Sequence, residues 1–244
     1  MRMLLLAGTP EAVQIARALA REERVIATAS LARATRRPAL LGIPTRIGGW
    51  GSTAAFAEWI SREGIEAVLD ATHPFANRIS LRSATVCRDL GVGYIQFLRP
   101  QAKPGPDDTW YFLNNEEETA GHIPTPSRIY LATGQRAIER FGPLPSATVH
   151  VRITEEPTHA FPFEAGNFIL RPEHATLGSE EALLFSLGTD WVVARNTGGM
   201  ATQSVLEAAR RLGLPVAMIR RPPQPEAHRI QTVAAALAWV RRRL

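Results

Sequence analysis

The sequence alternates between two kinds of segment for nearly its whole length, and this alternation is the strongest constraint on its fold. Short apolar runs such as "MLLLAG", "RVIATA" and "EAVLDAT" have the length and composition of buried strands. Each is followed by a segment such as "PEAVQIARALAREE", in which apolar residues recur at helical spacing. Strands that alternate with helices are typical of an α/β fold with parallel strands, and near-continuous apolar strands fit a sheet covered on both faces.

A change in composition divides the chain. The stretch "RPQAKPGPDDTW" (99–110) is rich in Pro, Gly and Asp and has the character of a connector. The alternation then resumes, with a helix near 135–141 and a final helix over 229–244. We therefore predict an α/β protein of two Rossmann-like lobes, with mainly parallel sheets and a ligand crevice between them. The expected boundaries are 1–100 for the first lobe, 101–127 for the connector and start of the second, and 128–244 for the rest.

The bulk composition excludes several classes of protein. With 244 residues, 45% of them hydrophobic, the chain can bury a sizeable core. It contains no apolar run of about 18 residues, and its first apolar run is too short for a signal peptide, so we expect a cytoplasmic protein with no membrane span. The single cysteine, Cys87, excludes an internal disulfide and is expected to be a buried thiol. The six histidines are scattered, so we expect no metal site.

The chain has a formal charge of +5, and almost all of its positive charge is arginine, because Lys103 is the only lysine. GC-rich codon usage would produce this bias without a functional cause. The alternative is a partner rich in carboxylates or phosphates, both of which pair with guanidinium groups. The arginines are spread along the chain and are not interleaved with aromatics, which argues against nucleic acid. We expect a small-molecule partner and a monomer, with the final helix packed on its own sheet.

The first strand leads into a candidate nucleotide site. In "LLLAGTPEA" the strand ends at Gly8, Thr9 suits a helix N-cap and Pro10 suits the first helical position. A helix that starts directly after the first strand of an α/β lobe is where a pyrophosphate binds. The full G-x-G-x-x-G fingerprint is absent, so an ordinary capped helix is the alternative. Glu11, in the first turn, would contact a ribose or support the loop.

The end of the second strand indicates which dinucleotide is bound. An acidic residue usually lies about 20 residues after the glycine turn, where it binds the ribose hydroxyls. Here the position carries Ser30, and the arginines Arg33 and Arg36 follow it. A hydroxyl beside arginines suits a 2′-phosphate, so we predict NADPH as the cofactor. Arginines on a solvated loop are the alternative.

The stretch "DATHPFA" follows the fourth predicted strand and would reach the same sheet edge as Gly8. It brings Asp70, Thr72 and His73 together, and Pro74 restricts the turn. His73 is our candidate catalytic residue, since it could hydrogen-bond the nicotinamide or transfer a proton. The alternative is that these side chains only satisfy backbone groups.

Two glycine-containing loops of the second lobe are candidates for binding substrate, because glycine lets a ligand approach the backbone closely. Each follows a predicted strand, and ordinary strand-end turns are the alternative. Their candidate residues are Thr133, Gly134 and Gln135 in "YLATGQRAI", and Arg195, Asn196, Gly198 and Gly199 in "VVARNTGG".

Together these segments resemble the precorrin-6A reductase family of cobalamin biosynthesis. The resemblance spans essentially the whole chain in order and is carried by "LLLAGTPEA", "TRIGGWG" (45–51), "DATHPFA", "ATGQ", and "ARNTGG" followed by "EAARRLGLPVAMIRRPP". The chain departs from the family at Arg195, where lysine is common. It departs again at Val13 and Gln14, where the family often has an arginine.

The resemblance implies that NADPH donates a hydride to the C18–C19 double bond of a tetrapyrrole macrocycle, giving precorrin-6B, with the macrocycle held between the lobes. Its many carboxylates would account for the arginine excess. The cofactor would be anchored at Gly8, Thr9, Ser30 and Arg33, with Gly48 and Gly49 near the adenosine and Asp70, Thr72 and His73 facing the nicotinamide. The second-lobe loops would hold the macrocycle. His73 and water are both candidates for the proton donor.

Three alternatives remain open from the sequence. One is an NADPH-dependent reductase of another carboxylate-rich molecule, including the cobalt-containing precorrin-6A. A second is a nucleotide-sensing binding module without catalysis. A third is a basic nucleic-acid-binding protein, whose affinity would fall steeply with salt.

Overall fold

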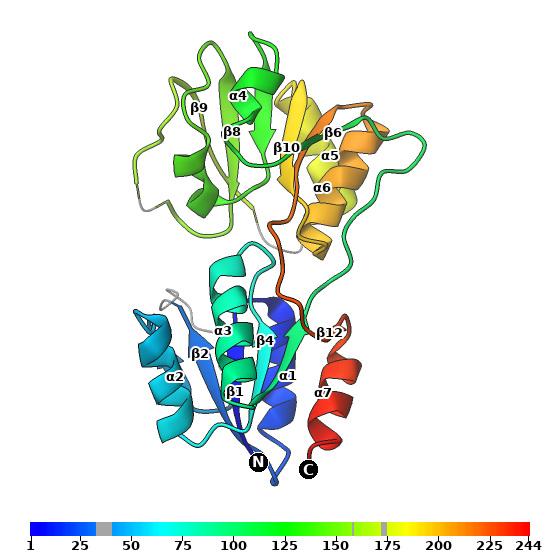
Figure 1. Ribbon diagram of the computed structural model, residues 1–244. Helices are drawn as coiled ribbons and strands as arrows, with labels where there is room; N and C mark the ends of the chain where they lie inside the picture. Colours follow the sequence, from blue (N-terminus) through cyan, green and yellow to red (C-terminus); the bar gives the residue numbers. More distant parts are fainter. Residues whose placement is uncertain (33–40, 158, 172–174) are drawn as a thin grey trace. The chain divides into compact units, whose positions relative to one another are not determined.

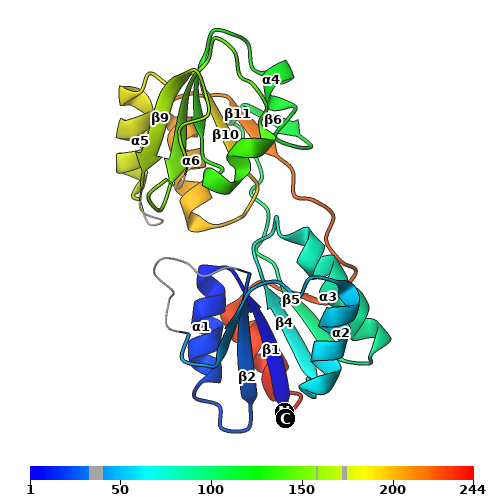
Figure 2. The ribbon, with the colours of Figure 1, turned by 90° about the vertical axis from the view of Figure 1, so that its left-hand side faces the viewer.

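The computed structural model describes residues 1–32, 41–157, 159–171 and 175–244, and the chain forms two compact units (Figures 1 and 2). The first unit combines Met1–Pro100 with Pro222–Leu244, and the second is Gln101–Arg221. Within the described residues each unit has one six-stranded sheet, and its strands pair in parallel. The predicted α/β class with two parallel sheets is confirmed.

The sheet of the first unit has the strand order β12-β5-β4-β1-β2-β3. The chain winds from β1 towards β2 and β3, then returns to place β4 and β5 on the other side of β1, so the winding direction reverses between β1 and β4. In open α/β sheets, this reversal marks the edge where ligands bind. The elements are β1 (Arg2–Ala7), α1 (Pro10–Leu19), β2 (Ile26–Leu31), β3 (Thr45–Ile47), α2 (Thr53–Arg62), β4 (Ala67–Ala71), α3 (Asn77–Asp89), β5 (Gly93–Phe97), β12 (Arg229–Ile230) and α7 (Val233–Arg241).

Both faces of this sheet are covered by helices, as Figure 2 shows. Successive side chains of a strand point to opposite faces. Met3 and Leu5 of β1 therefore lie in the core that includes α1 and α7, whereas Leu4 and Leu6 pack with α2 and α3. This two-sided burial explains why β1 is apolar at nearly every position.

The second sheet has the order β6-β11-β10-β7-β8-β9, and its winding reverses between β7 and β10. Helices α5 and α6 pack together against one apolar face of it. Among the described residues, no helix combines the length and the apolar character needed to cross a bilayer. The elements are β6 (Trp110–Leu113), α4 (Thr119–His122), β7 (Arg128–Leu131), the 3₁₀ helix η1 (Gln135–Arg140), β8 (Thr148–Ile153), β9 (Ala165–Leu170), α5 (Leu177–Ser186), β10 (Trp191–Arg195), α6 (Met200–Arg211) and β11 (Val216–Ile219).

The expected boundary at the C-terminal end is wrong. The sequence predicts that 128–244 belongs to the second lobe, but Pro222–Leu244 lies in the first unit. There β12 pairs with β5, and Trp239 and Val240 of α7 enter the core that contains α1. The final helix thus packs on its own chain, as expected, but it covers the other sheet.

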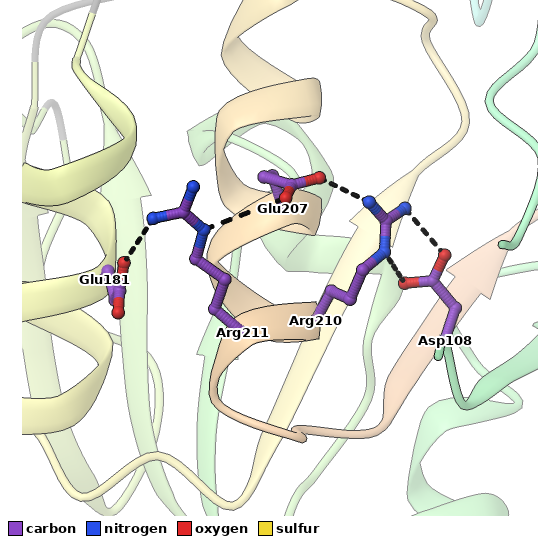
Figure 3. Close-up of polar contacts among 5 residues, drawn as sticks. All are labelled: Asp108, Glu181, Glu207, Arg210 and Arg211. Atoms are coloured by element: carbon purple, nitrogen blue, oxygen red, sulfur yellow. Dashed lines mark hydrogen bonds and ion pairs between the residues drawn. The ribbon is translucent and has the colours of Figure 1, made fainter. Parts of the chain in front are cut away.

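The connector is fixed to the second unit by a network of ion pairs (Figure 3). Arg210 on α6 donates to both carboxylate oxygens of Asp108, at 3.1 and 2.8 Å. Arg210 also pairs with Glu207. Arg211 forms one ion pair with Glu207 at 3.8 Å and another with Glu181 on α5 at 3.5 Å. The Asp108 side chain is almost fully buried, so this network ties the segment before β6 to α6.

Candidate functional site

At the winding reversal of the first sheet, the loops after β1 and β4 are in direct contact. A side-chain carbon added at Gly8 would lie 3.5 Å from the Thr72 Cα and the His73 backbone nitrogen. The Thr9 hydroxyl donates to the Ala71 carbonyl oxygen at 3.0 Å and accepts from the first turn of α1 at 3.3 Å. Thr9 is therefore the N-cap that the sequence predicts, and it also fixes the start of α1 against the end of β4.

Glu11, in the first turn of α1, forms an ion pair with Arg99, which follows β5 (3.4 Å between Oε1 and Nε). Its other oxygen, Oε2, is buried and has no hydrogen-bond partner within the described chain. A buried carboxylate oxygen without a donor is unfavourable, so a ligand hydroxyl would stabilise it. The Arg99 charge would also offset the repulsion between Glu11 and any phosphate bound at this helix terminus.

The sequence predicts that Asp70 faces a ligand. In the structure Asp70 lies beneath the His73 loop and is fully buried, so its side chain is not exposed to one. Its Oδ1 accepts from the backbone nitrogen of Thr72 at 3.0 Å and from the Thr72 hydroxyl at 2.7 Å. Its Oδ2 accepts from the Tyr94 hydroxyl at 2.7 Å. Burial, followed by the Asp70 charge, raises the pKa of Tyr94, which keeps this hydroxyl a donor. Asp70 therefore orders the loop that carries His73.

His73 is half-buried, and its Nδ1 accepts a hydrogen bond from the backbone nitrogen of Phe75 at 3.2 Å. This bond requires an unprotonated Nδ1, so the neutral ring carries its proton on Nε2. The side chain can then act as a hydrogen-bond donor through Nε2.

At the far side of β1, Ser30 and Arg46 occupy paired positions on β2 and β3. The Arg46 Nη1 donates to the Ser30 hydroxyl at 3.0 Å and to the Gly48 carbonyl oxygen at 2.8 Å. Its Nη2 donates to the Gly49 carbonyl oxygen at 3.2 Å, and the guanidinium lies over the Trp50 ring, 3.8 Å from its centroid. Sequence reasoning missed Arg46, because a charged residue within a short predicted strand carries no motif of its own.

Two of the predicted phosphate-binding residues, Arg33 and Arg36, lie outside the described residues.

In the second unit, the loops after β7 and β10 flank the winding reversal. The Thr133 hydroxyl is buried and has no hydrogen-bond partner in the described structure. Gly134 has φ +77°, and a side-chain carbon there would meet nothing within 4 Å, so its backbone is open to a ligand. Gln135 starts η1. Gly198 has φ +68°, and Gly199 is the N-cap of α6.

The other two predicted substrate residues have internal partners. Arg195 is buried and donates through Nε to Glu116 Oε1 at 2.7 Å, with a second contact from Nη2. The Asn196 side chain is buried and bonds to both the backbone nitrogen and the carbonyl oxygen of Ala102, each at 2.9 Å. These side chains order Glu116 and the connector, so the expected role in holding substrate carboxylates does not fit them.

The first-unit edge fits a dinucleotide. It offers a helix N-terminus beside a glycine, an unsatisfied buried carboxylate oxygen, and a hydroxyl-guanidinium pair on the next two strands, β2 and β3. Among the described residues, no group of three or more His, Cys, Asp or Glu side chains could hold a metal ion. The helix terminus, the carboxylate oxygen and the hydroxyl-guanidinium pair are of the kind that a bound nucleotide would use.

Comparison with known proteins agrees with this geometry. The family described as precorrin-6x reductase CbiJ/CobK matches residues 2–241. The precorrin-6A reductase of Rhodococcus erythropolis is 36% identical over 241 residues, covering 98% of this chain and 97% of that protein. The precorrin-6A reductase of Rhodobacter capsulatus is 32% identical over 240 residues, covering 98% and 95%. A solved structure of CobK precorrin-6A reductase has a TM-score of 0.90 and 32% identity, covering 99% of this chain and 96% of its own. The chain therefore belongs to the precorrin-6x reductase family.

Proposed function

We propose that this protein reduces precorrin-6A to precorrin-6B with NADPH, at the C18–C19 double bond of the macrocycle. The observation that carries the proposal is the similarity to precorrin-6A reductases over nearly the entire chain. The relatives reported above bear the name of the metal-free substrate, which favours it over the cobalt-containing one. The proposed working unit is the monomer, since α7 packs within its own chain.

The first unit holds the cofactor along the edge from β4 to β3. When bound, NADPH supplies the hydride. The backbone N–H groups at the start of α1 would bind the pyrophosphate beside Gly8. Glu11 Oε2 accepts from a ribose hydroxyl, and Ser30 with Gly48 and Gly49 forms the adenosine end.

His73 orients the nicotinamide. Reduction of a carbon–carbon double bond needs a hydride at one carbon and a proton at its neighbour. A neutral His73 that accepts at Nδ1 would have to become an imidazolate to give up its Nε2 proton. We therefore assign the proton to water and give His73 a positioning role beside the nicotinamide.

The second unit holds the macrocycle through its loops at the winding reversal. The Thr133 hydroxyl and the backbone N–H groups at the start of α6 bind carboxylates, and Gly134 allows close approach. Thr133→Val should therefore raise the KM for the macrocycle and leave the KM for NADPH unchanged.

The test mixes the protein with NADPH and precorrin-6A and follows both the nicotinamide absorbance and the macrocycle spectrum. Oxidation of the cofactor with a matching change in the macrocycle is the expected result. NADPH binding without turnover would indicate a sensing module, and turnover only of cobalt-precorrin-6A would reassign the substrate. His73→Ala should lower kcat without changing the pH–rate profile; loss of one limb of that profile would make His73 the proton donor.

A further inference from the structure

We propose that Arg46 is the residue that recognises the 2′-phosphate of NADPH. This inference rests on the proposed function and assigns a specificity determinant to its cofactor site.

The position of Arg46 along the sheet edge is the first argument. When a dinucleotide binds at the reversal between β1 and β4, its adenosine ribose lies at the end of β2, where an acid selects NADH. Ser30 occupies that end, next to Leu6 of β1 on one side and Arg46 of β3 on the other. The Arg46 guanidinium contacts the Ser30 hydroxyl at 3.0 Å, so it lies where the ribose 2′ substituent is expected.

The chemistry of the guanidinium is the second argument. Three of its five N–H donors are used by Ser30, Gly48 and Gly49, all of which present neutral acceptors. In the part of the chain that the structure describes, no carboxylate lies within ion-pair distance of Arg46, and its other donors, on Nε and Nη2, have no protein acceptor. A positive charge with only neutral neighbours is available for an anion.

The guanidinium is also preorganised. Trp50 lies under its face at 3.8 Å, and Trp50 itself packs edge-on against Phe56 with ring centroids 4.7 Å apart. Burial lowers the pKa of Arg46, since it disfavours the charged form, and a bound phosphate would offset that cost. Little side-chain freedom is left to lose on binding, which favours affinity.

The experiment compares binding of NADPH and NADH, by calorimetry, to the wild-type protein and to Arg46→Met, which keeps the apolar stem over Trp50. We expect Arg46→Met to weaken NADPH binding by at least about tenfold and to change NADH binding by less than about twofold. The pair 2′,5′-ADP and 5′-AMP should show the same contrast. Arg62→Met is the control for charge, because Arg62 lies exposed in the last turn of α2, bonded to Glu63.

The outcomes separate the two proposals. If the wild-type protein prefers NADPH and Arg46→Met keeps that preference, or loses affinity for both nucleotides equally, the assignment of Arg46 is overturned and the proposed cofactor stands. If the wild-type protein binds neither nucleotide, both proposals fail. Should Arg46→Met not fold, Arg46→Gln can replace it, because its amide is uncharged but is still a hydrogen-bond donor.

Discussion

The Tyr94 hydroxyl donates a 2.7 Å hydrogen bond to Oδ2 of Asp70 and so joins β5 to the end of β4 below the His73 loop. Tyr94→Phe removes this donor and leaves a buried carboxylate oxygen unsatisfied. We expect the free energy of unfolding to fall by about 1–3 kcal/mol, measured by urea denaturation. Tyr111→Phe is the control, because Tyr111 is 42% exposed and should tolerate the change. An equal fall in the free energy of unfolding of the two variants would contradict the role given to Asp70.

Cys87 should be inert in the folded protein. Burial, with a smaller contribution from the Asp70 charge, raises the pKa of its thiol to about 12. The thiolate is the reactive form, so at a pH near 8 only a very small fraction can react. A thiol-specific chromogenic reagent should label Cys87 slowly in buffer and rapidly in denaturant. Fast labelling of the native protein would show that α3 opens locally far more often than its burial indicates.

The Asp108–Arg210 pair should make the second unit sensitive to acid. Burial alone would raise the pKa of Asp108, but hydrogen bonds from Arg210 and from the Gly105 N–H hold it below its usual range. Such a group contributes stability above its unfolded pKa of about 3.9 and loses it as the pH falls through the folded pKa. Asp108→Asn should cost about 2 kcal/mol at neutral pH and show a flatter dependence below pH 4. If the free energy of unfolding of the wild-type protein and of Asp108→Asn fell in parallel as the pH was lowered, this linkage would be ruled out.

Gly8 allows a test that separates packing from ligand binding. An added methyl would make only ordinary contacts, at 3.5 Å, with the β4 loop, so Gly8→Ala should fold with a nearly unchanged melting temperature. In the proposed site the pyrophosphate would reach the start of α1 beside Gly8, so the same methyl should lower NADPH affinity by about tenfold or more. Unchanged affinity in a folded variant would move the pyrophosphate away from this turn.

Arg195 should stabilise the folded protein through its ion pair with Glu116. Arg195→Met leaves Glu116 buried without its partner, which typically costs about 3–5 kcal/mol. The double variant with Glu116→Gln should recover part of that loss, because the uncompensated charge is gone. A stable single variant with weakened macrocycle binding would instead restore the carboxylate-binding role that the sequence suggests.

Most of the secondary structure could be predicted from the sequence, because long apolar or amphipathic runs carry their own periodicity. The strands predicted at "MLLLAG", "RVIATA" and "EAVLDAT" are present as β1, β2 and β4, and the helix predicted at "PEAVQIARALAREE" is present as α1. Strand β6 was missed, since Trp110–Leu113 directly follows a segment rich in Pro and Gly. Strand β12 has two residues, too few for any pattern. The return of Pro222–Leu244 to the first unit depends on which sheet edge it meets, and local sequence does not encode that.

The candidate site was predictable where a strand end coincides with a motif, as at Gly8 and Thr9. It was not predictable where the decisive contact spans a long stretch of chain. Arg195 looks like a ligand for a carboxylate until Glu116, 79 residues earlier, is seen to supply one. Arg46 looks like a surface charge until β3 aligns it with Ser30.

The strand and helix that close the first unit have a consequence for biosynthesis. During translation, all of the second unit, Gln101–Arg221, emerges from the ribosome before the C-terminal segment of the first unit does. The edge of the first sheet beside β5 stays unpaired until Arg229–Ile230 emerges. Domains generally fold as units as they are made. In this chain the middle segment can therefore be completed before the N-terminal one, which reverses the usual order of maturation.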